Sequence, residues 1–97
     1  MFITLPNRWP ELGDIYLLDN GIKCIFDYSD GLQYGVSQSD GKRWGNNYLM
    51  GVTEWLKINK AVLLGNSQEL LRMFDKRDIS ENEWMKLNDF ETSEQRN

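Results

Sequence analysis

Three aspartates beside glycine-containing turns are the side chains best suited to bind a ligand. The tripeptide Ser-Asp-Gly occurs at residues 29–31 and again at 39–41, and Asp27 precedes the first copy. The carboxylates of Asp27, Asp30 and Asp40 are the kind of oxygen donor that calcium prefers. Their spacing does not fit an EF-hand loop, because Gln38 stands where that loop has its final glutamate. We therefore expect no metal site, and we interpret the two copies as turns that bound one strand of about seven residues.

Groups suited to catalysis are scarce. The chain has no histidine, so it lacks the usual general base near neutral pH and any Ser-His-Asp or Cys-His arrangement. The single cysteine, Cys24, lies among apolar residues of a predicted strand, where a thiol is more often core than nucleophile. Gly31, Gly35, Gly41 and Gly45 match no phosphate-binding pattern. We expect neither catalysis nor a cofactor, although a mechanism based on two carboxylates stays open.

The aromatic content favours binding. The chain has four tryptophans, four tyrosines and four phenylalanines, and tryptophan, tyrosine and arginine dominate the energetics of protein interfaces. By their pattern, we assign to the core Phe26, Tyr28, Tyr34, Phe74 and Trp84. The predicted partner-binding loop comprises Lys42, Arg43, Trp44, Asn46, Asn47 and Tyr48, with Trp55 and Trp9 as further candidates. The alternative for this loop is a turn with one buried tryptophan.

Acidic residues are concentrated toward the C-terminus. The chain carries 11 basic and 15 acidic residues, and from residue 78 onward there are six acids against two bases. Such a segment repels phosphate backbones and attracts basic surfaces. We therefore expect a protein partner rather than nucleic acid, with Glu81 and Glu83 among the partner-binding residues. The alternative is an ordinary solvated helix face.

The 97 residues are expected to form one domain. We assign residues 1–64 to a sheet, 65–91 to a pair of helices and 92–97 to a frayed tail. No basic cluster precedes an apolar run, and no apolar stretch approaches the ~18 residues of a membrane span. A lone cysteine fits a reducing compartment. We expect a cytoplasmic protein without membrane association, and the oligomeric state is not predicted.

Turn dipeptides and alternating side chains predict a β-meander in the first half of the chain. Asn20-Gly21 separates two apolar runs and predicts a hairpin with a type I′ turn. In the next strand, residues 22, 24, 26 and 28 point one way and residues 23, 25 and 27 the other. A third strand follows between the two Ser-Asp-Gly turns.

The pattern in the second half changes from strands to helices. We expect strands around residues 42–44 and 48–50, a single helical turn at 53–57 and a closing strand at 61–64. Two helices follow, because Asn66 with Glu69 and Ser80 with Glu83 have capping-box spacing. Ile79 and Trp84 have the spacing of a hydrophobic staple.

The expected fold class is α+β: an antiparallel meander of four or five strands, or a partly closed barrel, followed by two C-terminal helices. The pattern Gly13-Asp14-Ile15-Tyr16, the Asn20-Gly21, Asp30-Gly31 and Asp40-Gly41 turns, and a short turn near Trp55 resemble small SH3-like barrel proteins encoded by phages and prophages. The resemblance covers residues 11–64. It implies an accessory protein without catalysis that modulates a host factor.

Two functions from different classes agree with these features. The first is a protein-binding inhibitor or modulator, of the phage-accessory or toxin-immunity type, that occludes a host or cognate nucleic-acid-handling enzyme. The second is a barrel-type module for single-stranded nucleic acid, in which aromatic side chains stack on bases and Lys23, Lys42 and Arg43 meet phosphates. The small number of cations beside the aromatic residues favours the first.

Overall fold

A five-stranded antiparallel sheet is the centre of the molecule. The computed structural model describes residues 8–30, 33–74 and 79–90. The elements in chain order are β1 (Asp14–Leu17), β2 (Lys23–Ser29), β3 (Tyr34–Gln38), β4 (Arg43–Asn46), α1 (Leu49–Ile58), β5 (Val62–Asn66), α2 (Gln68–Phe74) and α3 (Glu81–Asn88). The strand order is β4-β3-β2-β1-β5, so the sheet is open and β4 and β5 are its edges. The predicted α+β class and meander are confirmed, whereas the sheet does not close into a barrel.

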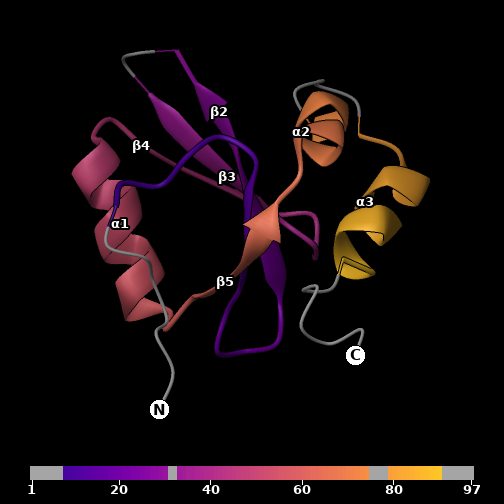
Figure 1. Ribbon diagram of the computed structural model, residues 1–97, viewed down its shortest axis with the longest axis horizontal. Coiled ribbons are helices and arrows are strands. Elements are labelled where there is room, and N and C mark those ends of the chain that lie inside the picture. The colour runs from indigo at the N-terminus through magenta and orange to yellow at the C-terminus, as the bar shows by residue number, and fades with distance from the viewer. Residues whose placement is uncertain (1–7, 31–32, 75–78, 91–97) are drawn as a thin grey trace.

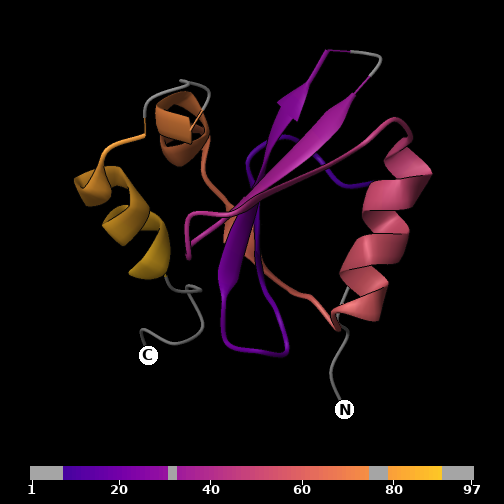
Figure 2. The ribbon, with the colours of Figure 1, turned by 180° about the vertical axis from the view of Figure 1, so that it is seen from behind.

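Helices cover both faces of this sheet. Figures 1 and 2 show α1 on one side and α2 with α3 on the other. Beneath α1, Cys24 and Phe26 of β2 join Val52 and Leu56 in one buried cluster. On the opposite face, Ile25 packs in a second cluster with residues of α2 and α3. The alternation predicted for β2 is therefore real, but both of its faces are apolar because both are covered.

The turn between β1 and β2 and the turn between β3 and β4 have the same backbone geometry. Gly21 N donates to Leu18 O and Gly41 N donates to Gln38 O, and both glycines have positive φ. Asn20 keeps a negative φ, so the turn is a type I turn followed by a glycine bulge, and the predicted type I′ turn is wrong. The Oδ1 atoms of Asn20 and Asp40 each accept a bond from the backbone N–H two residues later. The second Ser-Asp-Gly copy is thus a turn, as predicted, and β3 is shorter than expected.

The segment after β4 differs most from the prediction. The strand expected at residues 48–50 and the single turn at 53–57 are wrong, because a ten-residue helix, α1, spans both. Val52 and Leu56 lie one turn apart on its inner side and are fully buried. Asn46 fixes the turn that leads into the helix, because its Oδ1 accepts a hydrogen bond from the backbone N–H of Tyr48 at 2.8 Å. The predicted closing strand follows as β5.

The two C-terminal helices are confirmed. Ser80 and Glu83 form the predicted capping box at the start of α3. At α2 the cap is Ser67, whose Oγ accepts the N–H of Leu70, and the predicted cap at Asn66 is wrong because this residue ends β5. Phe74 of α2 and Trp84 of α3 pack edge to face, with ring centroids 5.0 Å apart. No helix among the described residues has the length and apolar character needed to cross a bilayer. The frayed tail predicted at 92–97 lies outside the described residues.

Candidate functional site

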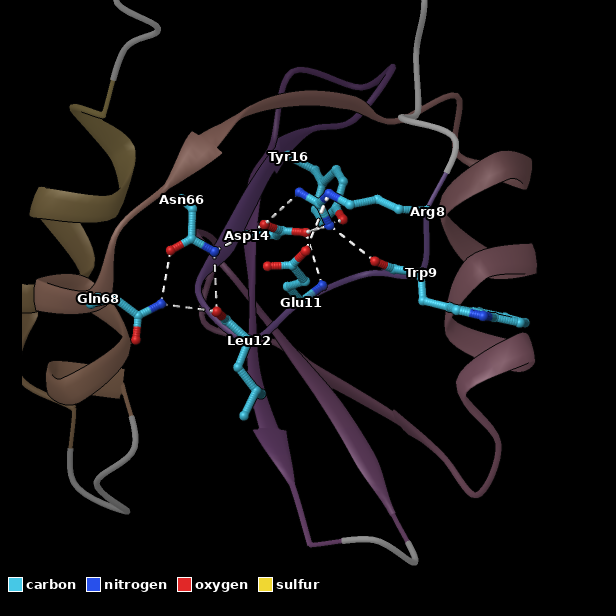
Figure 3. A network of polar contacts seen from close by, with 8 residues as sticks. All are labelled: Arg8, Trp9, Glu11, Leu12, Asp14, Tyr16, Asn66 and Gln68. Atoms are coloured by element: carbon cyan, nitrogen blue, oxygen red, sulfur yellow. Dashed lines mark hydrogen bonds and ion pairs between the residues drawn. The ribbon is translucent and has the colours of Figure 1, made fainter.

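A buried aspartate on β1 is the centre of the densest polar network in the described residues. The Asp14 side chain is inaccessible to solvent and accepts two bonds from the Arg8 guanidinium, at 2.9 and 3.2 Å (Figure 3). The Tyr16 hydroxyl, the Asn66 amide and the backbone N–H of Glu11 each donate a further bond of 2.9 Å. The network therefore joins the chain before β1 to the last residue of β5.

Hydrogen bonds to the Asp14 carboxylate keep it ionised despite its burial. Burial alone would raise the pKa of Asp14, but donors from Arg8, Asn66, Glu11 and Tyr16 outweigh it, and the pKa lies below its ordinary value. Burial, together with the charge of Asp14, raises the pKa of Tyr16. Asp14 is thus an ion whose oxygens are already occupied by internal donors. It stabilises the fold and is poorly suited to act as a base or nucleophile.

Gly13 allows this network to form. Its φ is +95°, and a Cβ atom there would lie 2.7 Å from Nε2 of Gln68 and 2.9 Å from Oδ1 of Asn66. Both amides bond to Leu12 O as well, at 3.1 Å (Figure 3). Sequence reasoning missed the network because Asn66 and Gln68, which complete it, are more than 50 residues from Leu12 and Asp14.

The aspartates singled out from the sequence point to separate partners. Asp27 is buried and accepts bonds from Ser37 Oγ and from Arg43, the latter at 3.0 Å. Asp30 accepts bonds from the Tyr28 hydroxyl and the backbone of Gln33, while Asp40 completes its own turn. Among residues 8–30, 33–74 and 79–90, no three histidine, cysteine or acidic side chains gather where a metal ion could bind.

Cys24 is part of the core, as its pattern predicted. The side chain is fully buried in the cluster beneath α1. Burial raises the pKa of the thiol to about 12, which leaves almost no thiolate at neutral pH. A nucleophilic role is therefore disfavoured on grounds of access and of ionisation.

Most of the predicted partner-binding residues lie together where β4 leads into α1. Trp44 of β4 stacks on Trp55 of α1, with ring centroids 5.0 Å apart and planes 20° from parallel. Tyr48, at the start of α1, is 72% exposed. We call this region the β4–α1 surface, and its members are Lys42, Trp44, Asn47, Tyr48, Trp55 and Ile58. The side chain of Arg43, also on β4, instead pairs with Asp27 on the opposite face of the sheet. Ile58, which the sequence did not single out, is 76% exposed.

The remaining predicted contacts are elsewhere or already engaged. Glu81 and Glu83 are on α3, which lies on the opposite side of the sheet from α1 (Figure 1). Glu83 also takes part in the α3 capping box. Tyr28, assigned to the core, is 41% exposed because a bulge interrupts β2 between Phe26 and Tyr28. Trp9 is exposed, and Figure 3 shows its side chain pointing away from the Asp14 network, on the side of α1.

Two of the three cations considered for phosphate binding have internal partners. Lys23 Nζ donates to the carbonyl oxygens of Asn88 and Phe90 at the end of α3. Arg43 pairs with Asp27, and Lys42 is exposed. The electrostatic basis for nucleic-acid binding is correspondingly weak.

Comparison of the chain with protein-family profiles, curated proteins and solved structures gives no match.

Proposed function

We propose that the protein is a non-enzymatic, protein-binding inhibitor or modulator that uses its β4–α1 surface to occlude a partner. The observation that carries this proposal is the exposure of two large apolar side chains at the two ends of α1, Tyr48 at its N-cap and Ile58 at its last residue. Apolar side chains gathered on the surface of a small domain typically mark an interaction site.

The distribution of reactive groups supports a binding role. The buried carboxylates Asp14 and Asp27 are engaged by arginines, and Cys24 is buried with a raised pKa. Trp44 and Trp55 form a stacked, partly exposed aromatic pair on the same surface, and rigid aromatic surfaces contribute strongly to protein interfaces.

The net charge supports a basic partner, such as a host or cognate nucleic-acid-handling enzyme of the phage-accessory or toxin-immunity setting. The chain carries a formal net charge of −4, and carboxylates can replace phosphates electrostatically at the site of such an enzyme. Because Glu81 and Glu83 lie across the sheet, the acids of α3 contribute long-range attraction rather than contacts at the β4–α1 surface.

Affinity capture from lysate of the source cells tests this proposal. Immobilised wild type should recover one protein in stoichiometric amount, and Ile58→Lys should lose it. Met85→Lys is the matched control, because Met85 is also an exposed apolar helix residue, at 55%, but lies on α3. Recovery of no stoichiometric protein, or equal recovery by both variants, would contradict the proposal.

A further inference from the structure

β4 is a sheet edge with unused backbone groups. Gln38 N donates to Lys42 O at 2.8 Å, and bonded and non-bonded pairs alternate along an antiparallel ladder. Trp44 and Asn46 therefore direct their backbone groups toward β3, and Arg43 and Gly45 direct theirs away from the sheet. Within the described residues, no bond to the outward groups is present. Such an edge readily pairs with another strand.

The other edge is less suited to pairing. Between Ile15 and Tyr16 the register of β1 with β5 shifts, so that Leu64 has no opposite residue. A bulge of this kind twists an edge strand and interrupts its row of donors and acceptors. The register of β3 with β4 has no shift. Of the two edges, β4 is therefore the one whose donors and acceptors are not interrupted by a bulge.

The side of α1 nearest β4 continues this edge as an apolar stripe. Trp55 stacks on Trp44, and Gly51 packs closely against the Asn46 side chain, so this side of the helix faces β4. Ile58 lies three residues after Trp55, which places it on the same side of the helix, and Tyr48 is the N-cap residue at the start of α1.

We propose that the protein forms a symmetric dimer in which β4 pairs antiparallel with β4 of a second copy. In one register, the outward backbone groups of Arg43 form hydrogen bonds with those of Gly45 in the second copy. In that register, Trp44 lies opposite Trp44 of the second copy. Arg43 then meets no like charge, because glycine has no side chain, and the tryptophans form a cross-strand aromatic pair. The strand is complementary to itself in this register.

The helices fit the same two-fold arrangement. Since α1 packs over β3 and β4, it lies about one strand spacing, ~4.8 Å, from the axis of such a dimer. The two α1 helices would thus be about 10 Å apart, the distance at which helices pack. They run antiparallel, so that Tyr48 of one copy lies beside Ile58 of the other.

The dimer would regulate the β4–α1 surface, because a second copy and a foreign partner cannot occupy it together. The existence of the dimer is independent of the proposed function, whereas this regulation rests on it. At high concentration the β4–α1 surface would be covered by the second copy, and at low concentration it would be free to bind the partner.

Sedimentation equilibrium of the full chain, from low micromolar to near-millimolar concentration, tests the dimer. We expect the mass to rise from 11.4 kDa toward twice that value for wild type and for Met85→Lys. Ile58→Lys should remain at the monomer mass with an unchanged circular dichroism spectrum. A monomer at every concentration, or equal masses for the two variants, would overturn the proposal.

Amide hydrogen exchange locates the interface. The Arg43 and Gly45 N–H groups should exchange rapidly in dilute protein and become protected in the dimer, whereas those of Trp44 and Asn46 should be protected throughout. A dimer without new protection at Arg43 and Gly45 would assign the contact elsewhere and refute the β4 arrangement. Dimerisation by this route together with failure of the lysate capture would leave the dimer established and the proposed function rejected.

Discussion

The structure contains two buried carboxylates, Asp14 and Asp27, and each forms an ion pair with an arginine. Asp14 holds Arg8 and Asp27 holds Arg43, and in both pairs the acid is fully buried while the arginine is partly exposed. Burying a charge is costly, and hydrogen bonds to both oxygens of Asp14 offset that cost. The same contacts that make these aspartates stable also remove them from chemistry with a ligand.

We predict that Asp14→Asn lowers the free energy of unfolding by about 2 to 3 kcal/mol at neutral pH, since Arg8 loses its charged partner at a site only partly open to water. The pKa of Asp14 is lowered in the folded protein. Its stabilising effect is therefore complete above the ordinary aspartate pKa of about 4 and is lost as pH falls through the lower folded value.

Urea unfolding at pH 7 and pH 3 measures this effect. The difference between wild type and Asp14→Asn should shrink at the lower pH. Asp19→Asn is the control, because Asp19 is exposed in a turn, and this change should stay within about 0.5 kcal/mol. A difference that does not change with pH would show that ionisation of Asp14 does not stabilise the fold.

At the scale of single elements, α3 depends on contacts at its two ends. Ser80 and Glu83 satisfy the free amides of its first turn, and Lys23 bonds to carbonyls at its last. A cation at this end also interacts favourably with the helix dipole. Because Lys23 is on β2, it ties the end of the helix to the centre of the sheet.

Ser80→Ala should cost about 1 kcal/mol of stability, the usual effect of removing an N-cap side chain. Asn82→Ala provides the comparison, since Asn82 is exposed on α3 and takes no part in the cap. Thermal unfolding followed by circular dichroism should show a lower melting temperature for the first variant only. Equal melting temperatures would indicate that the capping box contributes nothing in solution.

Elements set by neighbouring residues were predictable, and those set by distant contacts were not. The Ser80 box and the Asn20-Gly21 hairpin depend on a few consecutive residues, and both were found. The full length of α1 was not predicted, because Gly51 and Trp55 do not fit a simple helical spacing of apolar residues. Gly51 packs closely against the Asn46 side chain and Trp55 stacks on Trp44, and neither contact can be recognised from the sequence. The Asp14 network was out of reach, since Asn66 is 52 residues from Asp14.

For the candidate site, residue types were informative and their arrangement was not. Lys42, Trp44, Asn47, Tyr48 and Trp55 do lie on or beside β4 and α1. The sequence could not reveal that Arg43 reaches Asp27, nor that Ile58 stays exposed at the end of the same helix. Those facts depend on which face of the sheet each helix covers.

At the scale of the whole molecule, the electrostatics predict that single-stranded oligonucleotides do not bind. Lys23 and Arg43 are engaged internally, and the net charge of −4 repels phosphates. Fluorescence anisotropy with labelled oligonucleotides at low salt should therefore give no change. Salt-sensitive binding that Lys42→Ala weakens would instead support the nucleic-acid alternative.

The pairing of β1 with β5 has a consequence for biosynthesis. β1 leaves the ribosome before the other described elements, yet the strand that completes its outer side comes only after the meander and α1. Until then the nascent chain exposes an unpaired edge at β1, and the Asp14 carboxylate lacks its Asn66 donor. The hairpins can form during translation, but the finished sheet has to wait until β5 has been synthesised.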